Sequence, residues 1–207
     1  SADSQSDALE RGLAGYWKLD DGSGTSATDA STNGNTGTLT NGPTWTTGQI
    51  DGAVSFDGTD DYITEAGSSL YKFTSSFAFG GWFQPLADND VREIAGFDSG
   101  SSDRYDLFID NAGVESFGCR VRLTGGVLTA TFTTTVATGS WYNLYCSYDD
   151  SLKVVTLYVN GMKSAVSSTG SGTLTDGGTG LQKFLVGRST VASPGYWLST
   201  IDEVRIY

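Results

Sequence analysis

The stretch SFAFGGWFQP, residues 76–85, shows the alternation that decides the fold. Phe77, Phe79 and Phe83 fall on one face of an extended segment, and Trp82 falls on the other. A helix would need an apolar period near 3.6 residues, which this stretch does not have. It is therefore predicted to be a β-strand with one face in a core and a second, more polar face.

The same alternation recurs along the chain, between loops rich in Gly, Ser and Thr. It is clearest in residues 104–110, 117–123 and 141–149. The pair Asn160-Gly161 separates two strand-like runs and predicts a type I′ hairpin turn. Only residues 68–73 offer a short helical candidate. These features predict an all-β fold, a two-sheet sandwich.

Length and charge set the organisation of the chain and exclude some partners. With 207 residues, it is expected to form one domain over residues 12–207, preceded by a polar linker over residues 1–11. The net charge of -12 repels nucleic acid and anionic membranes. No apolar run approaches the roughly 20 residues of a membrane span, so neither nucleic-acid binding nor membrane insertion is expected.

Several segments occur in an order that resembles a known family. They are residues 12–39, 52–63, 77–85, 139–149, 157–161, 185–189 and 201–207. From Gly12 to Tyr207 the chain resembles the laminin-G-like, concanavalin A-like jelly-roll domains. That fold hosts lectins, carbohydrate-binding modules, adhesion domains, glycosidases and lyases, so the resemblance alone does not fix the function.

The resemblance implies a calcium ion where the N-terminal segment meets the final strand. The matching residue of the final strand is Asp202, and the matching loop residues are Asp29, Asn33 and Asn35, with Asp20 as a further candidate. Calcium takes six to eight oxygen ligands, and a loop rich in Gly and Asn can turn several carbonyls toward one point. Ca²⁺ is therefore the expected cofactor.

A second acidic cluster lies in DGTDDYI, residues 57–63. It is a rival metal site by composition. The simpler interpretation is a tight Asp-Gly turn with exposed carboxylates.

Catalytic classes are largely excluded. Without His the chain has no Ser-His triad and no imidazole zinc site, and the His of alginate-lyase-type relatives is missing. None of its Glu residues begins the Glu-x-Asp-x-x-Glu motif of the laminarinase-type relatives. Asp106 and Asp110 share a strand face, but four residues put their Cα atoms about 13 to 14 Å apart, beyond the roughly 5 to 9.5 Å of a catalytic carboxylate pair. The chain is predicted not to be an enzyme.

The second faces of the strands carry the residue types that bind sugars. These are Trp82, Gln84, Arg104, Asp106, Phe108, Asp110, Arg120, Arg122, Asn143 and Tyr145. Aromatic rings stack on sugar C–H faces while charged and amide groups take the hydroxyls. A plain sheet exterior has a similar mixture, so both interpretations stay open. A second candidate is the loop aromatic pair Tyr196 and Trp197.

Cys119 and Cys146 both fall on core faces. They are favoured as a disulfide, which an exported protein would allow, with two buried thiols as the alternative.

The combined prediction is a non-catalytic, calcium-stabilised module for carbohydrate binding or adhesion. Its expected partner is a glycan, a polysaccharide or a protein, and its expected location is secreted or surface-exposed. The alternative is a structural or interaction domain of a phage or other virion without a sugar site. A polysaccharide-degrading enzyme is the weakest of the three hypotheses.

Overall fold

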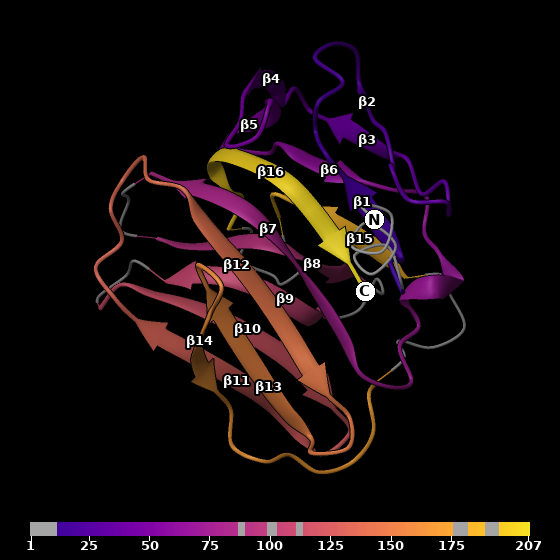
Figure 1. Cartoon of the computed structure of the whole chain (residues 1–207), viewed down its shortest axis with the longest axis vertical. Coiled ribbons are helices and arrows are strands. Elements are labelled where there is room, and N and C mark those ends of the chain that lie inside the picture. The colour runs from indigo at the N-terminus through magenta and orange to yellow at the C-terminus, as the bar shows by residue number, and fades with distance from the viewer. Residues whose placement is uncertain (1–11, 87–89, 99–102, 111–113, 176–181, 189–194) are drawn as a thin grey trace, which may run out of the picture.

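The computed structural model describes residues 12–86, 90–98, 103–110, 114–175, 182–188 and 195–207. Two eight-stranded antiparallel sheets pack against each other, which confirms the predicted sandwich (Figure 1). The predicted linker over residues 1–11 lies outside the described residues.

The first sheet, here called sheet A, contains both terminal strands. Its order is β14 (Met162–Val166), β13 (Val154–Val159), β12 (Tyr142–Asp149), β7 (Phe77–Pro85), β16 (Leu198–Ile206), β5 (Gly52–Asp57) and β4 (Thr44–Thr47), with β1 (Gly15–Trp17) paired to β16.

The second sheet, sheet B, packs behind sheet A in the view of Figure 1. Its order is β11 (Gly126–Thr133), β10 (Ser116–Leu123), β9 (Asp103–Asp110), β8 (Val91–Asp98), β15 (Lys183–Val186), β6 (Tyr62–Thr64), β3 (Gly37–Thr40) and β2 (Ser26–Ala27). The short helix η1 (Ser69–Tyr71) lies within the predicted helical candidate.

Aromatic rings from both sheets form the centre of the core. The ring of Phe79 in β7 lies 5.3 Å from that of Phe97 in β8, which lies 4.8 Å from that of Phe184 in β15. All three side chains are at most 2% exposed. Burying such a ring contributes about 1.5 to 3 kcal/mol, so the apolar face that the alternation predicted holds the sheets together.

A disulfide joins the two sheets through the core. Cys119 in β10 and Cys146 in β12 are both fully buried and bonded to each other. Of the two interpretations of these residues, the structure has the disulfide.

The hairpin between β13 and β14 has the turn that its sequence predicted. Asn160 and Gly161 both have positive φ, at 52° and 77°, as a type I′ turn requires.

A β-bulge in β16 interrupts the inside-outside alternation. The register with β7 shifts between Asp202 and Arg205, and Glu203 has a φ of 55°. Ile201 and Val204 both lie in the core. The two consecutive carboxylates between them therefore both project from the outer side of sheet A.

Candidate functional site

The predicted calcium ligands fall into two separate hydrogen-bonded groups. The carboxylate of Asp29 accepts bonds from the backbone N–H groups of Tyr16 (2.9 Å), Ser31 (2.9 Å) and Asn35 (2.7 Å), and from the Ser31 hydroxyl (2.8 Å). It is thus engaged in fixing its own loop against β1.

The two amides of this loop serve the same purpose. Asn33 Nδ2 donates to the carbonyls of Leu13 (2.9 Å) and Ala14 (3.2 Å), and Asn35 Nδ2 donates to that of Ala14 (3.0 Å). The expectation that Asp29 and these amides join Asp202 around one ion is therefore not met. Local donors satisfy the Asp29 carboxylate, and the carbonyls of Leu13 and Ala14 satisfy the Nδ2 groups of the two amides.

Asp202 and Asp20 form the second group, where β16 meets the loop between β4 and β5. Asp202 is fully buried, and its Oδ2 accepts a bond from the Ile50 N–H at 2.9 Å. Its Oδ1 has no partner among the described residues. Asp20 Oδ1 accepts from the Gly52 N–H at 2.7 Å. Burial first, and then the negative charges of Glu203 and Asp20, raise the pKa of Asp202 to about 7.

This site is tightly built. A Cβ placed at Gly48 would lie 2.7 Å from Asp202 Oδ2 and 2.1 Å from the Gly52 carbonyl oxygen, so the loop can pack on the carboxylate only with Gly there. Leu19 and Asp51 have positive φ, at 63° and 53°. Such strained backbone gathers at functional sites. The unpartnered oxygen of Asp202 and the clustered negative charge have the chemistry that a divalent cation would need.

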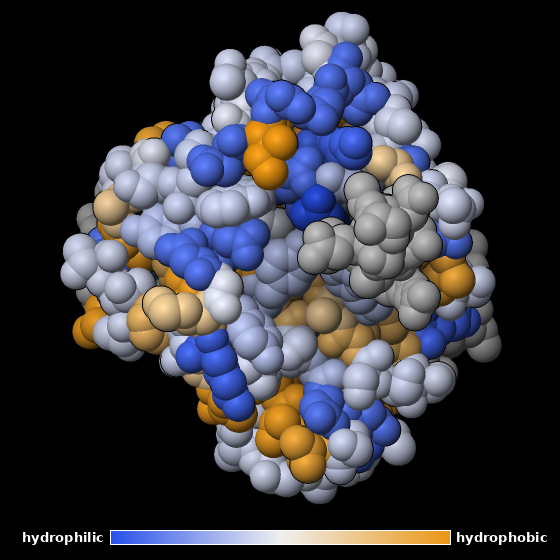
Figure 2. All heavy atoms as spheres, viewed as in Figure 1, coloured by the Kyte–Doolittle hydropathy of each residue, from blue (hydrophilic) through white to orange (hydrophobic). Residues whose placement is uncertain are grey.

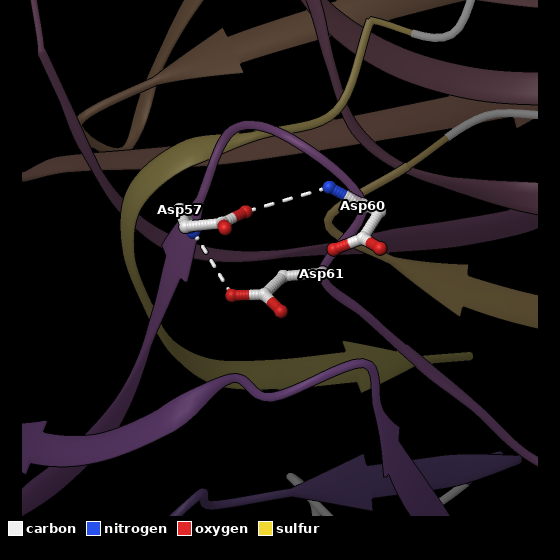
Figure 3. Close-up of side chains that lie close together, drawn as sticks. All are labelled: Asp57, Asp60 and Asp61. Carbon is white, nitrogen blue, oxygen red and sulfur yellow. Dashed lines mark hydrogen bonds between the residues drawn. The ribbon is translucent and has the colours of Figure 1, made fainter.

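The rival acidic cluster forms a turn after β5. The carboxylate oxygens of Asp57, Asp60 and Asp61 lie within 4.8 Å of one another (Figure 3). Asp57 Oδ1 accepts from the N–H groups of Thr59 (2.8 Å) and Asp60 (3.4 Å), and the Asp57 N–H donates to Asp61 Oδ2 (3.0 Å). The bond from Thr59 is the main reason why the pKa of Asp57 is lowered. The group thus has the local bonding of a turn.

The predicted sugar-binding residues do not form one face. Those on β7 and β12 lie on the outer side of sheet A, namely Trp82, Gln84, Asn143 and Tyr145. Those on β9 and β10 lie on the outer side of sheet B, namely Asp106, Phe108, Asp110, Arg120 and Arg122. Arg104 is in β9, but its side chain is outside the described part. Alternation assigns a residue to a strand face without assigning the strand to a sheet, and the single-face prediction was wrong for that reason.

Arg120 is the centre of the sheet B group. Its Nε donates to Asp106 Oδ1 at 2.8 Å, and its Nη2 lies 2.7 Å from both Asp106 Oδ2 and Glu93 Oε1. The side chains of Asp106 and Glu93 are 3% and 8% exposed, whereas that of Arg120 is 31% exposed. Burial lowers the pKa of Arg120, but the two carboxylates more than offset this and raise it overall. The guanidinium is thus held rigid and charged at the surface.

Phe108 supports this guanidinium. The Arg120 Cζ lies 4.3 Å from the centre of the Phe108 ring. On the other side, a Cβ at Gly118 would lie 2.0 Å from Phe108 Cζ, so the ring packs over that glycine. Phe108 is only 8% exposed, and the prediction that it stacks directly on a sugar is not supported.

The two loop aromatics differ in exposure. Trp197 is 1% exposed, with its ring 6.3 Å from that of Phe83 in the core, so its predicted role in binding was wrong. Tyr196 is half-buried. The Arg188 Cζ lies 5.4 Å from the Tyr196 ring and 4.7 Å from the ring of Tyr62.

Sequence reasoning missed Glu93, Tyr62 and Arg188. The register of β8 against β9 shifts on both sides of Ala95, so a period of two does not place Glu93 on the outer face. Tyr62 and Arg188 belong to short strands or their ends, where no alternation can be read. Only their residue types, aromatic and cationic, gave a signal.

The chain matches one family model and several solved structures. The model, described as the concanavalin A-like lectin/glucanases superfamily, matches residues 57–207. Comparison with curated proteins gives no match. No helix among the described residues is long and apolar enough to cross a membrane.

The solved structures include binding domains. The binding domain of Paraclostridial Mosquitocidal Protein 1 has a TM-score of 0.72 at 15% identity, over 96% of this chain and 49% of that one. A putative carbohydrate binding protein from Bacteroides ovatus has a TM-score of 0.58 at 22% identity, over 75% and 42%. The Ruminococcus gnavus IT-sialidase CBM40 bound to alpha2,3 sialyllactose has a TM-score of 0.54 at 18% identity, over 66% and 77%. The chain spans about half the length of the first two, and at these identities the likeness is one of fold.

Proposed function

The chain belongs to the concanavalin A-like lectin/glucanase superfamily, and on that premise we propose that it is a non-catalytic glycan-binding module. The binding surface is the outer face of sheet B, centred on Arg120. A calcium ion at Asp202 and Asp20 stabilises the fold. The inter-sheet disulfide supports a secreted or surface-exposed location.

The observation that carries this proposal is the fixed guanidinium on a sheet surface. Two buried carboxylates and an aromatic ring hold Arg120 in one position. A donor that is already ordered loses little conformational entropy when it binds a ligand oxygen. Tyr196 is half-buried, and the Arg188 Cζ lies 5.4 Å from its ring, so Tyr196 offers a partly exposed aromatic ring to a ligand. The solved sialyllactose complex of a similar fold supports a glycan as the ligand.

The same contacts argue against glycoside hydrolysis. Glu93 and Asp106 both bind Arg120 Nη2, so a guanidinium occupies the space between the two carboxylates. A glycosidase needs one of its two carboxyl groups protonated as the acid. A neighbouring cation favours the ionised form of both.

For calcium, the fit rests on Asp202. Its buried and unpartnered Oδ1, with Asp20 nearby, supplies the hard oxygen ligands that Ca²⁺ prefers. Asp202, Asp20 and carbonyl groups of the adjoining loop would hold the ion. When bound, it would neutralise the buried negative charge and tie the final strand to the N-terminal segment.

Glycan binding is tested with an array, run with calcium present. The wild type is expected to bind one class of glycan. Arg120→Lys keeps the charge but loses the fork geometry, and Tyr196→Ala removes the ring; each should weaken binding on the order of tenfold. Asp60→Asn, in the acidic turn, is the matched control and should bind like the wild type. Binding to no glycan, or the absence of any glycan whose binding both site variants weaken, would refute the proposal.

Calcium is tested by thermal unfolding with calcium and with excess chelator. At free calcium a hundredfold above its Kd, the ion should add about 2.7 kcal/mol to the free energy of unfolding. That corresponds to a rise in Tm of roughly 5 to 10 °C for a domain of this size. Asp202→Asn should abolish the rise, whereas Asp60→Asn should keep it. If Asp60→Asn alone abolished it, the ion would belong to the turn after β5 instead.

A further inference from the structure

The outer face of sheet A carries a continuous row of cross-strand neighbours. Successive Cα partners along this row are Tyr16, Arg205, Gly80, Tyr145, Tyr158 and Lys163. Paired residues in a sheet project to the same side, so these side chains share one face. With strands about 4.8 Å apart, the row from Tyr16 to Tyr158 is about 19 Å long.

The charged groups at one end of the row are paired with each other. Arg205 Nη2 makes an ion pair with Glu203 and donates to the Tyr16 hydroxyl at 2.6 Å, and its Cζ lies 4.0 Å from the centre of the Tyr16 ring. The Tyr16 hydroxyl in turn donates to Glu203 Oε2 at 2.6 Å. Burial raises the pKa of Tyr145, whereas the Arg205 guanidinium acts to lower it, so the two groups lie near each other. The arginine is therefore neutralised and fixed within the row.

Gly80 leaves space at the middle of the row, and an aromatic ring lies over it. A Cβ at Gly80 would lie 2.6 Å from Tyr145 Cγ, so the Tyr145 ring can lie across β7 toward Arg205 only because position 80 has no side chain. Trp82, two residues along β7, is paired with Asn143. The rings of Tyr145, Tyr158 and Trp82 are all half-buried, with part of each surface still exposed.

The shape of the face fits an elongated occupant. Figure 2 shows this side of the molecule hollowed near its centre, where β7 and β16 run in Figure 1. The row crosses both strands at right angles to their length. An extended ligand lying along the row would pass over the hollow and contact several rings in turn.

We propose that this row, together with Trp82 and Asn143, is a second glycan-binding surface, which takes a neutral polysaccharide chain. Half-exposed aromatic rings suit sugar C–H faces, and tyrosine hydroxyls, the indole N–H and the Asn143 amide suit sugar hydroxyls. The row offers an anionic ligand only Lys163 at one end, because Arg205 is already neutralised by Glu203. The chain's net charge of -12 further repels polyanions. The surface is on the opposite sheet from Arg120 and does not depend on the function proposed there.

The experiment is calorimetric titration of the whole chain, in calcium, with neutral hexasaccharides of glucose, mannose and xylose, and with acidic oligogalacturonate. Tyr158→Ala and Trp82→Ala each remove one ring of the row. Tyr158→Phe keeps the ring and controls for folding, as do melting curves of all variants. Arg120→Lys and Tyr196→Ala report on the opposite face.

We expect at least one neutral hexasaccharide to bind. Each ring deletion should weaken that binding on the order of fivefold, while Tyr158→Phe and both opposite-face variants should bind it like the wild type. Neutral-sugar binding lost only in Arg120→Lys and Tyr196→Ala would overturn this inference and leave the proposed function standing. If neutral-sugar binding depended on the rings and Arg120→Lys changed the binding of no glycan, the proposed function would be refuted and this inference would stand.

Two other results would also overturn it. One is binding of oligogalacturonate alone, lost on ring deletion, because the ligand would then be acidic. The other is self-association in ultracentrifugation that Tyr158→Ala abolishes, because a second copy of the chain would then be the occupant.

Discussion

The double variant C119A/C146A is expected to lose about 3.5 kcal/mol of unfolding free energy, because its unfolded chain is no longer closed into a loop of 27 residues. The bond is the one side-chain cross-link between sheets A and B in the part of the chain described, and it lies among fully buried side chains. Urea denaturation should show the loss as a lower midpoint, and thermal unfolding as a Tm about 10 °C lower.

Reduction of the wild type separates the bond from the packing. Cys→Ala also removes two buried sulfur atoms, which leaves a small cavity, whereas a reduced wild type keeps these atoms. The reduced protein should therefore retain slightly more stability than the double variant. A loss below 1 kcal/mol in both would show that the bond does not constrain the unfolded chain as argued.

Replacing Arg120 by Ala is expected to lower the free energy of unfolding by about 3 kcal/mol. The substitution removes the guanidinium that Asp106 and Glu93 share, and both carboxylates are buried. Breaking a buried pair by removing one partner leaves uncompensated charge, which costs about 3 to 5 kcal/mol. We take the lower value because the Arg120 side chain is 31% exposed.

Arg122→Ala is the matched control for this substitution. Arg122 lies two residues along β10 and is exposed, so its loss should change the stability by no more than about 0.5 kcal/mol. Arg120→Met keeps the apolar stem over Phe108 and separates lost charge from lost packing. Equal, small effects of all three substitutions in urea denaturation would mean that Arg120 is an ordinary surface residue.

The candidate site was only partly predictable. Asp202 was identified through the resemblance, and its buried Oδ1 has no hydrogen-bond partner among the described residues. Asp29 was grouped with it through the same resemblance, yet four local donors occupy its carboxylate. Composition shows that a side chain can bind a metal. It does not show which backbone groups form hydrogen bonds with that side chain in the folded protein.

The prediction of a single sugar-binding face failed in a similar way. Trp82 and Arg120 both stand on the polar faces of alternating strands, but the two faces point in opposite directions from the sandwich. Trp197 was read as a loop aromatic and is in the core. In each case the missing information was the neighbouring strand or the layer covering the residue.

What the sequence by itself determined is the local face of each strand and the turn that reverses the chain. Phe77, Phe79 and Phe83 are buried as the period of two requires, and Asn160-Gly161 turns as its left-handed preference requires. These properties depend on residues that are adjacent in the chain. Only the tertiary structure decided the sheet of each strand, the bulge that turns both Asp202 and Glu203 outward, and the meeting of Glu93 with Arg120. Those features depend on pairings between distant segments. The free energy of these pairings comes from burying the two sheets against each other, and no single strand encodes it.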